Sequence, residues 1–221
     1  MAFLENLLIM LPGFILAISF HEMAHAYMAY KLGDPMARNL GRITMNPAKH
    51  FDLYGSLAFL VVGLGWGRPV PVNSRMLRKP KRDMALISLA GPVANLILAF
   101  LTFLLFVIIT YVLAICGLGG WLYEGGILKV LVEILFYVYV VNISLMVFNL
   151  IPIPPLDGSK ILFSLLPHKA YRFVLTYERY GMFIMLAVLY LGILDVPLSM
   201  ASGFFYDILY NTLNAVIRMV H

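Results

Sequence analysis

The sequence predicts an all-α polytopic membrane protein, and three observations lead to this fold class. Of the 221 residues, 62% are apolar and only 12% are charged, whereas a soluble domain has about 45–50% apolar and about 25% charged residues. The mean hydropathy is +0.90, and the apolar residues form runs long enough to cross a bilayer. The single cysteine, Cys116, cannot form an intramolecular disulfide. These features exclude a soluble globular protein, a disordered chain and a disulfide-stapled extracellular scaffold.

The first apolar run extends from about Phe3 to Tyr30. As a helix it measures about 42 Å, more than the ~30 Å hydrocarbon core of a bilayer. It lacks a basic n-region and a small-residue cleavage site, so it is a membrane span and not a signal peptide. Four ionisable residues interrupt it: Glu5, His21, Glu22 and His25.

Residues 31–82 carry ten of the sixteen basic residues and only two acidic ones, a net charge of +8. This excess predicts that the segment faces the cytoplasm. Within it, Leu53–Trp66 is apolar but too short for a span, which favours a re-entrant or interfacial element. The flanking pieces Arg42–Met45 and Arg68–Asn73 have the proline and glycine context of short edge strands. The sequence therefore predicts a small membrane-associated β/re-entrant region on the cytoplasmic side.

Four further spans are predicted after this region. Met84–Ile115 carries no charge, and Ile127–Ile151 follows an outer turn at Cys116–Gly126. Tyr180–Leu194 and Val196–Ile217 read as two short spans joined at Asp195. The result is about five transmembrane helices, with the N-terminus outside and the C-terminus inside. The overall charge of +5 is explained by these inner-side residues, so we expect the lipid bilayer and not nucleic acid as the charged partner.

The segment His21-Glu22-Met23-Ala24-His25 is an H-E-x-x-H pattern on a predicted helix. Residues i and i+4 share a helix face, so both imidazoles can bind one metal ion, and the glutamate beside them can act as a general base. At the chain's own His and Glu frequencies, roughly 0.0025 chance matches are expected. Ionisable groups inside a membrane helix are also costly, which favours a functional reason for them.

A catalytic zinc takes three protein ligands and a water, so a third ligand is needed. Asp157 is favoured because three prolines precede it where the third span reaches the inner side, and irregular backbone at that depth lines a cavity or is buried in protein. Its alternative role is a helix N-cap. The other candidates for the third ligand are His50, His168, Asp52, Glu133 and Asp207.

The two motifs together resemble the site-2 protease family of intramembrane zinc metalloproteases. The carrying residues are His21-Glu22-x-x-His25 and, about 130 residues later, Asn149-x-x-Pro152-x-Pro154-x-x-Asp157-Gly158. The resemblance covers about residues 15–165. It implies a single integral membrane metalloprotease domain over residues 1–221, with the catalytic core at about 3–166 and C-terminal helices at about 170–221. The PDZ and nucleotide-sensing domains of some members are absent, so the chain resembles a minimal member.

The resemblance also implies roles for individual residues. His21, His25 and Asp157 would hold one Zn²⁺ per chain, Glu22 would activate water, and Asn149 would contact the substrate. The substrates would be single-span membrane proteins that are cut within or near the bilayer. Asn95, in Gly91-Pro92-Val93-Ala94-Asn95, is a further substrate-binding candidate that could hydrogen-bond a substrate carbonyl. The alternative for this segment is close helix packing by its small residues.

Two other classes of protein compete with the protease. A metal or ion transporter could use the histidines and Asp157 as a midplane site, although transporters usually carry inverted repeats and no repeat is visible here. Nor does a transporter need Glu22 between its ligands. The second class is a catalytically silent zinc-binding membrane scaffold, although every expected catalytic residue is present.

Overall fold

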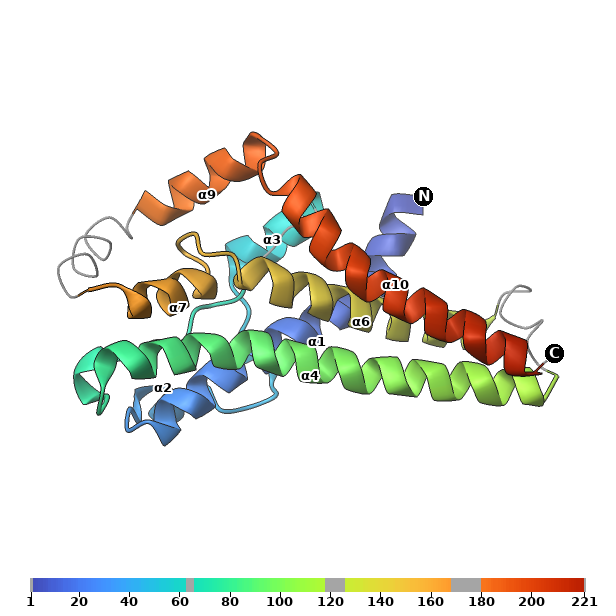
Figure 1. Ribbon diagram of the computed structural model, residues 1–221. Coiled ribbons are helices and arrows are strands. Elements are labelled where there is room, and N and C mark those ends of the chain that lie inside the picture. Colours follow the sequence, from blue (N-terminus) through green and yellow to red (C-terminus); the bar gives the residue numbers. More distant parts are fainter. Residues whose placement is uncertain (1, 63–65, 118–125, 168–179, 221) are drawn as a thin grey trace.

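The computed structural model describes residues 2–62, 66–117, 126–167 and 180–220 (Figure 1). The regular elements in these ranges are all helices, in agreement with the predicted class. In chain order they are α1 (Ala2–Lys31), α2 (Met36–Asn39), η1 (Pro47–Lys49), α3 (Leu53–Val62), η2 (Ser74–Met76), α4 (Pro80–Ile115), α6 (Ile127–Asn149), α7 (Asp157–Leu165), α9 (Gly181–Tyr190) and α10 (Asp195–Val220).

Three of the described helices are long and apolar enough to cross a membrane. They are Leu7–Lys31 of α1, the whole of α4 and the whole of α6, with 25, 36 and 23 residues. The sequence predicted these three spans with ends within a few residues. Helix α4 begins at Pro80, whose missing N–H costs nothing in a first turn, and the Lys79 amide donates to Asp83 Oδ2 at 2.8 Å. The chain is therefore a multi-pass membrane protein.

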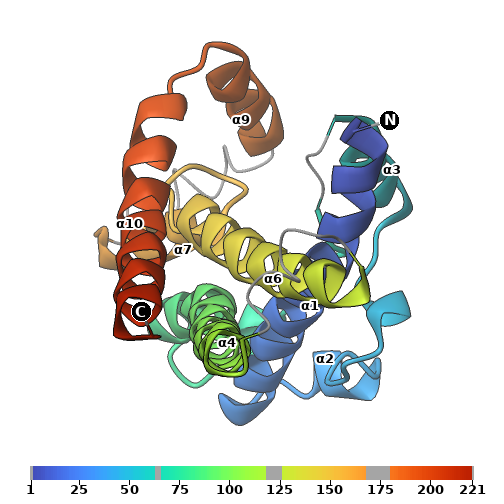
Figure 2. The ribbon, with the colours of Figure 1, turned by 90° about the vertical axis from the view of Figure 1, so that its right-hand side faces the viewer.

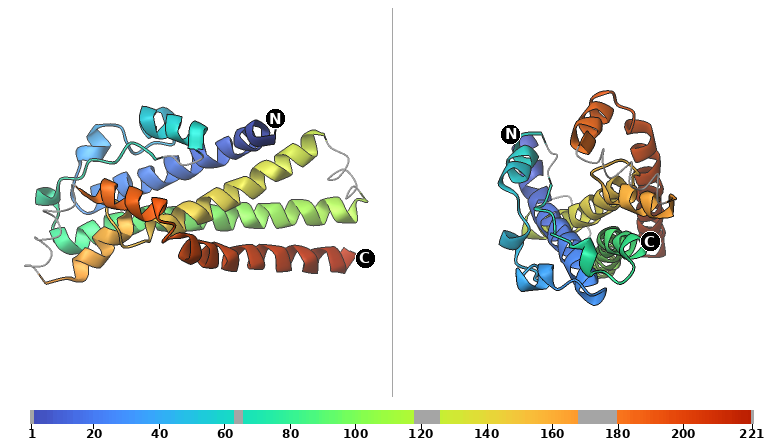
Figure 3. Two further views of the ribbon diagram at one scale, coloured as in Figure 1. Left: turned by 90° about the horizontal axis from the view of Figure 1, so that it is seen from above. Right: turned by 90° about the vertical axis from the view of Figure 1, so that its left-hand side faces the viewer.

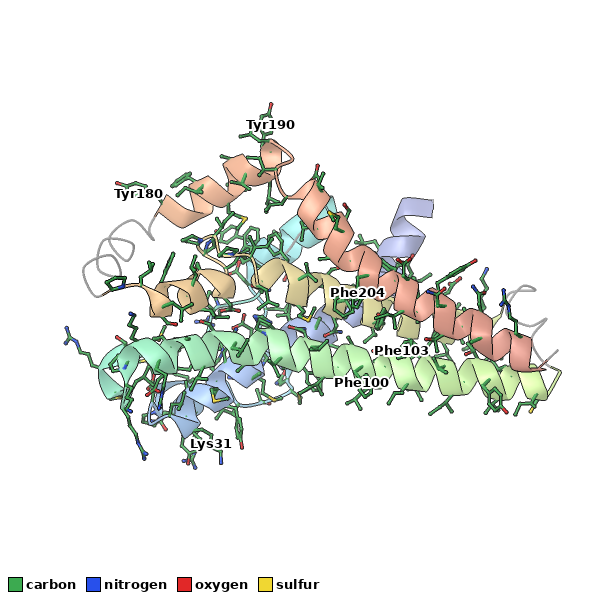
Figure 4. The ribbon with its side chains drawn as sticks, viewed as in Figure 1. Lys31, Phe100, Phe103, Tyr180, Tyr190 and Phe204 are labelled. Atoms are coloured by element: carbon green, nitrogen blue, oxygen red, sulfur yellow. The ribbon has the colours of Figure 1, made fainter. Side chains whose placement is uncertain are left out.

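The three spans pack against one another to form the centre of the molecule (Figure 2). The inward face of α4 carries small and polar residues, whereas large apolar residues cover its outward face, as expected when the surroundings are lipid. Phe100 lies on the outer side of α4 and Phe103 on the side toward α10 (Figure 4). Gly13 of α1 lets the helices cross closely, because a Cβ there would lie 3.0 Å from the Tyr137 carbonyl oxygen of α6.

The prediction of five spans is not confirmed. Helix α9 has 10 residues, about 15 Å, which is too short to cross a bilayer. Helix α10 runs parallel to α4, and its last turns lie beside the end of α4 (Figures 1 and 3). Leu209 of α10 joins a core cluster with Ala99 of α4 and Ile143 of α6. Helix α10 thus ends at the opposite end of the molecule from Lys31 (Figures 1 and 4). Five spans of alternating direction would end at the same side as Lys31.

The two short strands predicted in the basic segment are not formed. The regular pairing there is one antiparallel bridge between Phe51 and Gly67, and the Arg68 amide donates to the His50 carbonyl at 2.6 Å. Pro69 and Pro71 have no N–H to donate, so a ladder cannot extend past Arg68. The predicted re-entrant stretch begins as helix α3, while residues 63–65 lie outside the described ranges.

Candidate metal centre

Two histidines and one aspartate from distant parts of the chain meet in the middle of the bundle. His21 and His25 lie one turn apart on α1, and Asp157 is the first residue of α7. The Nε2 atoms of the histidines are 2.9 Å apart, and each is 3.1 Å from Asp157 Oδ2. All three residues are buried, and within the described part of the chain they form the group of ligand-type side chains that could hold a metal ion.

The hydrogen-bond partners of the two Nδ1 atoms determine the tautomer of each imidazole. His21 Nδ1 lies 2.6 Å from Asn95 Oδ1, and His25 Nδ1 lies 2.7 Å from the Ile87 carbonyl oxygen. Both partners are acceptors, so each Nδ1 donates its hydrogen and each neutral ring keeps a lone pair on Nε2. In these neutral tautomers the two Nε2 lone pairs and a carboxylate oxygen point at one another. This donor set fits a cation, and two imidazoles with a carboxylate are zinc ligands.

Asp157 reaches the histidines through the irregular segment between α6 and α7. Helix α6 ends at Asn149, and the proline-containing turn leads to Leu156 and Asp157. Leu156 packs with Met185 of α9 and with Leu194, so the short helix α9 covers this turn from outside. Gly158 is required for the tight return, because a Cβ there would collide with the Leu150 carbonyl oxygen. The buried part of this irregular segment is its end, Leu156 and Asp157, whereas Leu150, Pro152 and Pro155 are exposed.

Gly91 of α4 lies against both histidine rings. A Cβ at Gly91 would lie 2.5 Å from His25 Cε1 and 2.6 Å from His21 Cε1, well inside van der Waals contact. Neither ring can turn away without breaking the hydrogen bond of its Nδ1 atom. The metal centre therefore requires glycine at position 91, because a larger residue would displace the imidazoles.

We expect Gly91→Ala to displace both imidazoles and to weaken zinc binding and cleavage. A misplacement of about 1 Å at a reacting centre costs on the order of 10²-fold in rate. The matched control is Gly203→Ala on α10, where a Cβ would meet nothing within 4 Å. Zinc content and cleavage rate measured on both variants check the prediction. Equal zinc content and rate in the two variants would show that the contact is not limiting.

Glu22 lies beside the cluster on the same helix. Its Oε2 atom is buried without a hydrogen-bond partner, and its Oε1 atom lies 3.3 Å from where a Cβ on Gly67 would stand. The charge of Glu22 also acts on the buried guanidinium of Arg42: burial lowers the pKa of Arg42, and the Glu22 carboxylate opposes this shift. A carboxylate oxygen without a partner in a buried site is costly unless a reactant uses it.

The remaining candidates are not among the three converging ligands. Asn95 is fully buried and its Oδ1 atom lies 2.6 Å from His21 Nδ1, so its contact with substrate stays a prediction. Asn149 is partly exposed, and its Nδ2 donates to the Leu145 carbonyl at 3.0 Å. His50 is buried but pairs with the Thr44 carbonyl at 2.8 Å, away from the cluster. Glu133 pairs with Lys129 at 3.8 Å.

The other three residues considered as the third ligand are not in the cluster or are not described. Asp52 caps the Gly55 amide, Asp207 is exposed, and His168 lies outside the described residues. Sequence reasoning missed Asn142, which is fully buried in α6. An amide in an otherwise apolar span was the signal that could have found it.

A buried His-His-Asp set with a neighbouring carboxylate, built on membrane-crossing helices, defines a membrane-embedded metallohydrolase. Comparison with known proteins supports this class. Residues 9–192 match peptidase family M50. "Putative zinc metalloprotease YwhC" of Bacillus subtilis is 41% identical over 176 residues, 79% of this chain and 76% of the relative.

Two relatives from other organisms carry the same description. Rip2 of Mycolicibacterium smegmatis is 28% identical over 82% of this chain and 66% of the relative. MJ0611 of Methanocaldococcus jannaschii is 30% identical over 73% of this chain and 71% of the relative. No solved structure matches significantly. The chain therefore belongs to peptidase family M50, the site-2 protease family, and is an intramembrane zinc metalloprotease. The comparisons do not favour the alternative interpretations of the chain as a transporter or as a zinc-binding scaffold.

Proposed function

We propose that His21, His25 and Asp157 hold the zinc ion and that Glu22 is the general base of peptide hydrolysis. The observation that carries this assignment is the convergence of the two Nε2 atoms and Asp157 Oδ2 within 3.1 Å, with Nδ1–H donors on the far side of both rings. When bound, zinc lowers the pKa of a coordinated water toward about 7 and polarises the scissile carbonyl.

Glu22 handles the proton in this proposal. Its carboxylate takes a proton from the attacking water and later passes it to the leaving amine, so it ends each cycle ionised. Its Oε2 atom is not engaged by another described group, so that oxygen is available as the acceptor.

We infer that the substrates are single-span membrane proteins and that water enters from the cytoplasmic side. His21 is ten residues before Lys31, so it lies about 15 Å from the inner end of α1. Asn149 is partly exposed and lies where α6 ends and the turn to Asp157 begins, and we propose that its Oδ1 atom accepts a substrate N–H. A helical substrate must unwind locally before attack, because its carbonyls are otherwise held in i→i+4 bonds.

The experiment for this function is cleavage of a single-span segment in liposomes, with the product ends mapped by mass spectrometry. We expect zinc-dependent cuts inside the apolar segment or at its inner boundary. Cuts only in soluble flanks, made equally well in a soluble peptide, would contradict an intramembrane substrate. Glu22→Gln protein in the same liposomes is the negative control for cleavage.

The orientation follows from charge and helix direction. We propose that the basic segment 31–82 faces the cytoplasm, that the N-terminus lies outside, and that Phe51 lies at the depth of Phe14, because the centroids of their rings are 6.3 Å apart. Helices α9 and α10 would then form one broken crossing instead of two spans. This revises the predicted inside location of the C-terminus, because α10 runs parallel to α4 (Figure 3).

Thiol labelling tests this orientation. Cys116 is free and exposed at the end of α4, so an impermeant reagent should label it from outside. In a Cys116→Ser background, Arg78→Cys should react only from inside and Arg218→Cys only from outside. Labelling of Arg218→Cys from inside would restore the five-span topology, and outside labelling of Arg78→Cys would overturn the orientation.

A further inference from the structure

A continuous set of hydrogen bonds runs from His21 through two buried asparagines on different helices. His21 Nδ1 donates to Asn95 Oδ1 of α4 at 2.6 Å, and Asn95 Nδ2 donates to Asn142 Oδ1 of α6 at 2.8 Å. Asn142 Nδ2 then donates to the Val138 carbonyl at 2.7 Å. Both asparagines have no exposed surface, so water does not substitute for these bonds.

The direction of each amide is determined by its other partners. Asn95 Nδ2 also donates to the Ala17 carbonyl at 3.1 Å, which uses both of its hydrogens on acceptors. Rotating this amide by 180° would set its oxygen against the Ala17 and Asn142 oxygens. Asn142 is held in the same way, because its Nδ2 faces a backbone carbonyl. Asn95 Oδ1 therefore must face His21, and it can only accept a hydrogen there.

We propose that Asn95 and Asn142 are positioning residues that keep His21 in the tautomer and orientation that ligate zinc. The chain of bonds starts at backbone carbonyls of α1 and α6 and ends on the ring, so the packing of three helices determines the lone pair on His21 Nε2. The ring of His25 is held in the same way, but by a backbone group: its Nδ1 donates to the Ile87 carbonyl. Of these two supports, the one that holds His21 is made by side chains, and so it can be removed by substitution. This inference rests on the proposed zinc role of His21.

A purely structural role for the asparagines makes a different prediction. If they only join helices, replacing one of them with leucine of similar size would lower the unfolding temperature, because the partner amide loses its hydrogen bond, and would leave zinc affinity unchanged. If they position His21, zinc affinity should fall even where the protein stays folded. Outer partners of metal-bound histidines typically contribute roughly 10–100-fold to metal affinity.

The test measures zinc affinity by competition with a chromophoric chelator, on full-length protein in detergent. Asn95→Leu should weaken zinc binding roughly 10–100-fold and lower kcat with little change in KM for a single-span substrate. Asn142→Leu should have a smaller effect, because Asn95 keeps its Ala17 bond. Asn142→Asp should restore most of the affinity, since a neutral carboxyl group accepts from Asn95 Nδ2 and donates its O–H to the Val138 carbonyl. Thr102→Val on α4, which removes a buried hydroxyl bonded only within the helix, is the control.

The possible results separate this inference from the proposed function. Wild-type zinc affinity in Asn95→Leu, or a loss no greater than in Thr102→Val, overturns the positioning role while the protease assignment stands. Absence of zinc binding by wild-type protein overturns the proposed function itself. If Asn95→Leu does not fold, the comparison of Asn142→Leu with Asn142→Asp decides: equal affinities in the two contradict the proposal, and a loss in the leucine variant alone supports it.

Discussion

Glu22→Gln should cleave a single-span substrate slower than wild type by on the order of 10²–10⁴-fold, the usual contribution of a positioned base. Glutamine keeps the size of the side chain but cannot take up the proton. Zinc content should stay at one ion per chain, because Glu22 is not among the three converging ligands. The variant should be at least as stable as wild type, since it replaces a buried carboxylate oxygen that has no described partner.

The comparison needs a carboxylate that lies outside the site. Glu133→Gln makes the same chemical change on α6, where Glu133 faces Lys129 at 3.8 Å and is partly exposed. Its cleavage rate should equal that of wild type. Cleavage at the wild-type rate by Glu22→Gln would remove Glu22 as the base, even if the zinc site were confirmed by other means.

Asp157→Ala should lose zinc and, with it, nearly all activity. A missing direct ligand is expected to cost more than the roughly 10–100-fold that an outer partner contributes. Removing Asp157 also leaves two imidazoles to fill a site that ordinarily has three protein ligands. Zinc content of purified protein, measured alongside thermal unfolding, is the readout.

Asp207→Ala serves as the control for this change, because Asp207 is exposed on α10. It should retain one zinc and full activity. Full zinc occupancy in Asp157→Ala protein would remove Asp157 from the metal centre. The third ligand would then have to come from another side chain near His21 and His25.

The sequence predicts well those features that depend on local pattern. Hydropathy locates α1, α4 and α6, because a span must be apolar along its whole length. The i, i+4 spacing of His21 and His25 predicts their meeting, and the prolines before Asp157 indicate an irregular segment that returns to the core. Each of these inferences needs only one segment of the chain at a time.

Features that depend on contacts between helices could not be predicted from one segment of the sequence. Asn95 was expected to face a substrate, but its amide is directed by Ala17 and Asn142, which lie on two other helices. Gly91 looked like a packing residue, and only the crossing of α1 over α4 shows that it admits the imidazoles. Hydropathy also could not show that α9 stops after 10 residues, because α9 is apolar for packing over the turn near Leu156.

Zinc titration of metal-free enzyme tests the central claim most directly. Protein stripped by a chelator is reconstituted in liposomes with a single-span substrate, and cleavage is followed while zinc is added back. We predict no cleavage without metal and a linear return of activity that ends at one zinc per chain, with no return in Asp157→Ala or Glu22→Gln protein. Cleavage that persists in the metal-free enzyme, or that returns equally in these two variants, would contradict a zinc-dependent intramembrane protease built on His21, His25, Asp157 and Glu22.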